Sequence, residues 1–107
     1  MAERMTLGEV EGSHSLSFDC GDLPVDDVIV AAGHEPNGYF WEGVAHLVAP
    51  DLVPQLELDS EGGMFCAYGP RGVLEGLRRL LKPYLEDGPR IARLIATAES
   101  SGFEFPD

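Results

Sequence analysis

Hydrophobic and polar residues alternate along an early segment of the chain, which predicts a β-strand. Within residues 13–20, Leu16, Phe18 and Cys20 are separated by single polar residues, a serine and an aspartate. Successive side chains on a strand point to opposite faces, so one face should lie in a core and the other in water. Residues 5–11 alternate less regularly, and Gly12 predicts the turn of an antiparallel hairpin.

A second strand pair is predicted in the middle of the chain. Residues 55–59 alternate again, and the glycine-rich stretch 60–63 marks a turn. Residues 64–68, Met-Phe-Cys-Ala-Tyr, are apolar on both faces. This pattern predicts a central strand that is covered on both sides.

Two helices are expected between these strand pairs. Residues 25–32 carry apolar side chains at helical spacing, with Pro24 suited to the first turn and Gly33 to the C-terminal cap. A second helix is predicted over residues 39–48, and Pro50 ends it.

Two further helices are expected after the second strand pair. The predicted helix over 73–86 has an apolar stripe with the i, i+4, i+7 spacing that is typical of an amphipathic helix. The stripe consists of Val73, Leu74, Leu77, Leu80, Leu81, Tyr84 and Leu85. Gly88 and Pro89 separate this helix from the last one, whose stripe contains Ile91 and Ile95. Residues 101–107 form an expected tail that Phe103 and Phe105 could pin to the body.

The predicted order of elements is therefore ββααββαα. Alternating runs of strands and helices favour an α+β fold, with helices packed on an antiparallel sheet of about four strands. A chain of 107 residues suits one domain, over residues 1–107.

The charge of the chain restricts its partners. Seven lysines and arginines are outnumbered by nineteen acidic residues, which gives a formal net charge of −12. Thirteen of the acidic residues and one basic residue lie within residues 1–70. Nucleic acid and anionic membranes are therefore not expected partners. A basic protein partner would be attracted, although acidity can also serve solubility alone.

Catalytic and metal-binding chemistry finds little support in the sequence. The chain has neither a secretion signal nor a membrane span, so we expect a cytoplasmic protein with free, buried thiols at Cys20 and Cys66. No nucleophile motif or phosphate loop is present, and we expect neither catalytic residues nor a cofactor. Glu42 and His46 are spaced i, i+4, with His34 and Glu35 nearby, but such a pair is common on helix surfaces. We therefore predict no metal site.

Two dense segments are candidates for a partner interface. The first contains Tyr39, Phe40 and Trp41, which cannot all face one core because helical positions are about 100° apart. Tyr39 should then lie near the surface, unless all three pack beneath the loop. In the second segment, Glu57, Asp59 and Glu61 form an acidic row that should face water along a strand and the following turn. This row is either a docking surface for a partner or an ordinary solvated face. The candidate interface residues are Glu35, Tyr39, Trp41, Glu42, Glu57, Asp59 and Glu61.

These segments give the chain a resemblance to a known family. The stretch Asn-Gly-Tyr-x-Trp-Glu at 37–42, the acidic turn ending Glu-Gly-Gly-Met-Phe-Cys-Ala-Tyr at 61–68 and the long helix that follows resemble bacterial immunity protein family 51. The resemblance covers residues 5–100. It implies a small cytoplasmic α+β protein, without catalytic residues, that binds and blocks a cognate polymorphic toxin.

The resemblance does not identify the toxin. A nuclease, with its basic groove, fits the acidic charge, while a peptidase, a deaminase or a pore former remain alternatives. A regulatory or adaptor domain that binds another protein is the second hypothesis, and a small metal-binding enzyme is the third. Nothing in the sequence predicts the oligomeric state.

Overall fold

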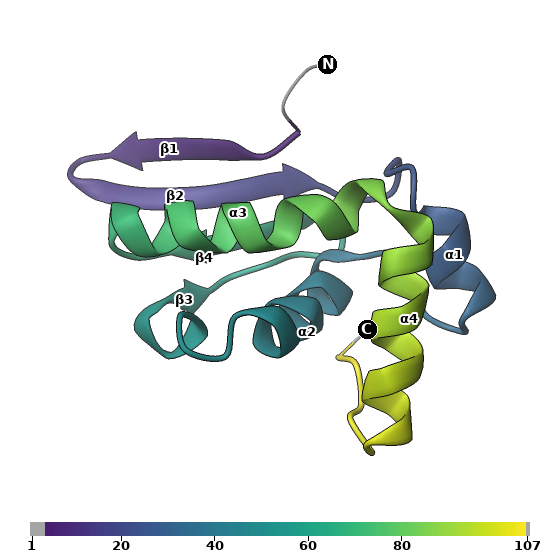
Figure 1. Ribbon diagram of the computed structural model, residues 1–107. Coiled ribbons are helices and arrows are strands. Elements are labelled where there is room, and N and C mark those ends of the chain that lie inside the picture. Colours follow the sequence, from purple (N-terminus) through teal and green to yellow (C-terminus); the bar gives the residue numbers. More distant parts are fainter. Residues whose placement is uncertain (1–3, 107) are drawn as a thin grey trace.

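The computed structural model describes residues 4–106 and has the expected order ββααββαα, with a short 3₁₀ helix before the third strand (Figure 1). The α+β class is confirmed. The strands are β1 (Thr6–Val10), β2 (Ser13–Asp19), β3 (Glu57–Leu58) and β4 (Met64–Tyr68). The helices are α1 (Asp26–Ala31), α2 (Gly38–Val48), η1 (Val53–Gln55), α3 (Arg71–Glu86) and α4 (Gly88–Ser100).

The four strands form one antiparallel sheet in the order β1-β2-β4-β3. Leu16 of β2 lies opposite Leu7 of β1, and Phe18 lies opposite Phe65 of β4. Both β2 residues are buried, which confirms the alternation. The two-residue turn between β1 and β2 has positive φ at both positions, including +83° at Gly12, as a tight hairpin requires.

Helices α2 and α3 contact each other and pack on β4 and β2 respectively, so they cover the same face of the sheet (Figure 1). The largest fully buried side chains between these layers include Leu16, Phe40, Trp41, Phe65, Leu74, Leu77 and Leu81.

β4 is central, as predicted, but it is not covered by helices on both sides. On the opposite face Met64 is half-buried and Tyr68 is 39% exposed. Cys66 lies between them and is buried, in a row with Ser17 of the neighbouring strand. The neighbouring strands thus shelter the centre of β4, and its apolar sequence does not require a second helical layer.

The third strand is shorter than the predicted 55–59. The preceding residues form η1, whose first turn contains Pro54. The Cys66 N–H donates to the Ser60 hydroxyl at 3.0 Å, where a regular ladder would use a backbone carbonyl. This side-chain bond replaces a ladder bond, and β3 retains two residues.

The apolar stripe of α3 is narrower than the sequence pattern suggests. Leu74, Leu77, Leu81 and Leu85 are buried, whereas Leu80 is 42% exposed. Leu80 is one helical step of about 100° from Leu81, and the sheet and α2 cover only one side of the helix.

Helix α1 begins later than predicted, whereas its C-terminal cap and the contact of the tail with the body are as predicted. Pro24 precedes α1, which begins at Asp26, while Gly33 has φ +91° and donates its N–H to the Val30 carbonyl at 2.9 Å, closing the helix as expected. After α4, the ring of Phe105 stacks on Phe40 at 4.9 Å between centroids. The tail is thereby held against α2.

Within residues 4–106, none of the helices is long and apolar enough to cross a membrane.

Candidate partner-binding surface

The fold brings the aromatic segment and the acidic turn into direct contact. Gly38, the first residue of α2, donates its N–H to the carbonyl of Gly62 in the β3–β4 turn at 3.2 Å. A Cβ atom at position 38 would overlap the carbonyl oxygens of Glu61 and Met64. Backbone therefore touches backbone at this junction, and only glycine allows so close an approach.

Asn37 fixes the start of α2 beside this contact. Its Oδ1 accepts a hydrogen bond from the Phe40 N–H at 2.8 Å, which satisfies a donor that the helix leaves unpaired. Its Nδ2 donates to the Glu35 carboxylate at 3.3 Å. Glu35, a predicted interface residue, is exposed beside the helix N-terminus.

Glu42 holds the junction together from one turn further along α2. Its Oε2 accepts the Ser60 N–H at 3.0 Å, and this carboxylate is therefore engaged inside the domain. The sequence predicted Glu42 as an interface residue, and the structure gives it a local role in positioning the acidic turn.

Of the three successive aromatic residues, Tyr39 alone is exposed, at 42%. Trp41 is completely buried, with its ring edge-to-face against Phe18 at 5.7 Å and Phe40 at 5.5 Å. Trp41 thus has no surface to offer a partner. It supports the helix from beneath, while Tyr39 remains available.

Three carboxylates line the outer edge of the sheet next to this junction. Glu57 lies opposite Tyr68 and Glu61 opposite Met64, and Asp59 between them donates its N–H to the Cys66 carbonyl at 2.9 Å. All three acidic side chains are exposed. We call Glu57, Asp59 and Glu61 the acidic edge, and the acidic edge together with Glu35 and Tyr39 the acidic surface.

Tyr68 is an exposed aromatic residue that is not among the interface residues predicted from the sequence. Its hydroxyl shares a hydrogen bond with the Cys66 side chain, and this bond, with smaller contributions from Asp59 and Glu57, raises the pKa of Tyr68. The hydroxyl is therefore neutral at physiological pH. Tyr68 lies at the end of β4, and its acidic neighbour Glu57 belongs to the adjacent strand β3. The sequence alone does not show which strand lies next to β4, so it could not identify Tyr68 as part of the acidic region.

The residues predicted as weak metal-ligand candidates do not converge. Glu42 is engaged with Ser60, and His46 is exposed further along α2. In the described part of the chain, no group of three or more histidine, cysteine or acidic side chains could hold a metal ion.

The two cysteines are free, and we expect both to react slowly in the folded protein. Cys66 is buried and Cys20 half-buried. Burial, with smaller contributions from Asp26 and Asp19, raises the pKa of Cys20 to about 11, and burial also raises the pKa of Cys66. Because the thiolate is the reactive form, labelling by a disulfide reagent at pH 8 should be slow until denaturant is added. Labelling of the native protein as fast as that of the unfolded chain would contradict this.

A family model described as Immunity protein 51 matches residues 5–100 of the chain. A search of curated proteins and a search of solved structures find no match.

Proposed function

The chain belongs to the Immunity protein 51 family, and from this premise we propose that it binds a cognate bacterial toxin and blocks the toxin's functional site. The family match carries this proposal. The proposed contact region is the acidic surface, and the proposed location is the cytoplasm of the cell that the protein protects. On this reading the protein is a non-catalytic antidote that acts as one domain.

The acidic surface supports binding of a basic toxin. Its carboxylates lie on a hairpin edge and a helix start that are locked together by the Gly38–Gly62 and Glu42–Ser60 hydrogen bonds. A preorganised row of charge attracts an oppositely charged partner before contact and fixes its orientation after contact. Toxins that act on nucleic acid need a basic groove, so a nuclease is the toxin class we favour.

The proposal is tested with the toxin domain encoded by the neighbouring gene. Co-expression of the chain should restore growth to cells that produce this toxin, and the two purified proteins should form a stoichiometric complex. An adaptor domain, the alternative function, would bind its partner without protecting these cells. Absence of protection with a folded, well-expressed chain would therefore contradict an immunity function.

Tyr39 is expected to contribute strongly to this complex. Exposed tyrosines are frequent interface anchors, and loss of such an anchor costs about 2 kcal/mol or more of binding free energy. We expect Tyr39→Ala to weaken toxin binding by at least this amount, measured by calorimetry. Leu80→Ala is a matched control, because Leu80 has the same 42% exposure but lies on α3. Equal affinities for the two variants would remove Tyr39 from the interface.

A further inference from the structure

The face of the sheet that α2 and α3 leave open is lined mainly by hydroxyl groups. The register places Ser15 opposite Gly8 on one side and Tyr68 on the other, and Ser17 opposite Thr6 and Cys66. Ser15 and Ser17 are half-buried by their neighbours, whereas Thr6 and Tyr68 are exposed. Among the described side chains of this face, Tyr68 is an exposed aromatic residue, and we call the face the platform.

Carboxylates border this platform. Asp19 ends β2 opposite Met64, and Glu57 pairs with Tyr68 on the far side of β4. A shallow hollow of about 680 Å³ lies beside Tyr68. Its lining includes Ser13, Pro54, Leu56, Glu57 and Tyr68. A tyrosine ring together with a carboxylate is a favourable setting for the cationic end of a lysine or arginine side chain.

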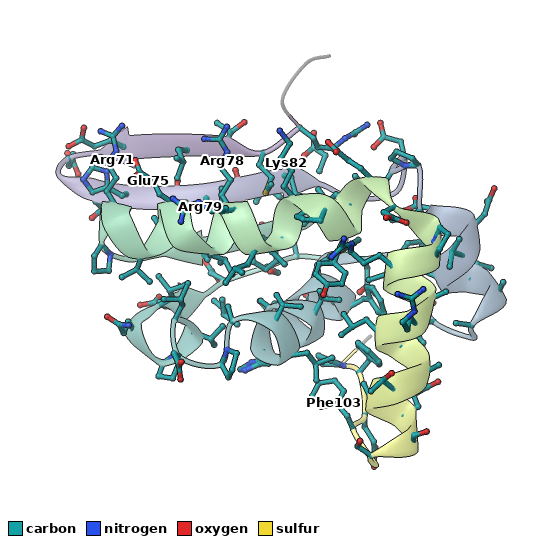
Figure 2. The ribbon with its side chains drawn as sticks, in the orientation of Figure 1. Arg71, Glu75, Arg78, Arg79, Lys82 and Phe103 are labelled. Atoms are coloured by element: carbon teal, nitrogen blue, oxygen red, sulfur yellow. The ribbon has the colours of Figure 1, made fainter. Side chains whose placement is uncertain are left out.

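Helices α3 and α4 carry most of the basic residues of the chain. Six of the seven basic residues of the chain lie on α3 and α4. Figure 2 shows four of them, Arg71, Arg78, Arg79 and Lys82, along α3. Residues 71–107 contain six basic and six acidic residues, so their formal charge is zero, while residues 1–70 carry the whole net charge of −12. A basic partner is therefore attracted more strongly by the carboxylates around the open face than by α3 and α4.

We propose that the open face of the sheet is the docking platform for a basic protein partner, with one lysine or arginine of that partner inserted between Tyr68 and Glu57. This inference rests on the proposed function for the identity of the partner, the cognate toxin. It extends the contact from the acidic edge across β4 and β2, and makes Tyr68 a central anchor.

The test compares two substitutions that add the same charge to opposite layers. Ser15→Arg places a cation in the middle of the platform, and Leu80→Arg places one on the exposed side of α3. The probe is the purified toxin domain encoded by the neighbouring gene, and the readout is its dissociation constant. Like-charge contact should weaken binding by about 100-fold for Ser15→Arg, and Leu80→Arg should bind like wild type. Circular dichroism and melting temperature establish that each variant is folded.

Two further variants keep the inference testable if Ser15→Arg does not fold. Thr6→Arg adds the charge at an exposed position of the same face, and Glu57→Gln removes one carboxylate without changing its shape. Both should weaken binding. Wild-type affinity of the folded platform variants, whether or not Leu80→Arg weakens binding, would overturn the docking platform while the immunity function stands. A wild-type chain that neither binds nor protects against the toxin would overturn both.

Discussion

Replacement of Leu77 by alanine is expected to lower the free energy of unfolding by about 2–5 kcal/mol. Leu77 is fully buried near the middle of α3, in the layer that packs on the sheet and α2. Truncation would remove apolar contacts and leave a cavity that close-packed neighbours can fill only in part. Chemical denaturation monitored by the fluorescence of Trp41, which lies in the same core, measures the change.

Leu80→Ala is the matched control for this measurement. The same atoms are removed from the same helix, but at a side chain that is 42% exposed, so the loss should stay within about 0.5 kcal/mol. Equal stability losses in the two variants would mean that α3 does not pack on the sheet through the side that carries Leu77.

Replacement of Gly38 by alanine should destabilise the protein by about 3 kcal/mol, at the upper end of the usual range for overpacking. The new Cβ would overlap the carbonyl oxygens of Glu61 and Met64, which are backbone atoms and cannot rotate away. Helix propensity alone predicts the opposite sign, since alanine is favoured over glycine in helices by about 1 kcal/mol. Thermal or chemical unfolding therefore distinguishes the two effects directly.

Gly62→Ala is the control on the other side of this junction. No atom lies within 4 Å of a Cβ placed there, and the backbone does not have the positive φ that favours glycine. Its stability should remain close to wild type. If Gly38→Ala were also neutral or stabilising, α2 and the β3–β4 turn would not be in backbone contact, and the acidic surface would lose its rigid frame.

Sequence patterns predicted the type and order of the strands and α-helices, but neither all of their ends nor their arrangement. Strict alternation predicted β2, because a half-buried strand imposes a period of two on its side chains. The same reasoning made β4 central, but could not show that its outer face is open, since the cover of Cys66 comes from neighbouring strands. The end of β3 depends on the Ser60–Cys66 hydrogen bond, which has no sequence period.

In the candidate site, too, features set by local helix geometry were predicted from the sequence, and features set by contacts with distant segments were not. Helical geometry predicted that Tyr39 would be left at the surface, and the structure exposes it. The burial of Trp41 and the engagement of Glu42 with Ser60 follow from contacts with distant segments. Tyr68 was missed because its acidic neighbours become neighbours only when β3 pairs with β4.

The proposed function assigns toxin binding to a local acidic surface, and not to net charge alone. Its most direct test is the toxin dissociation constant of Asp59→Lys with Glu61→Lys, beside that of Glu11→Lys with Glu86→Lys. Both double variants change the net charge equally and alter exposed side chains, but only the first pair lies on the acidic edge.

We expect the acidic-edge variant, still folded, to lose at least about 100-fold in affinity, and the control pair to lose less than about tenfold. The remaining affinity of the acidic-edge variant should also depend less on ionic strength, because screened attraction is what was removed. Equal affinities for the two double variants would mean that the acidic edge does not contact the toxin, and the acidity of the chain would then serve long-range attraction or solubility alone.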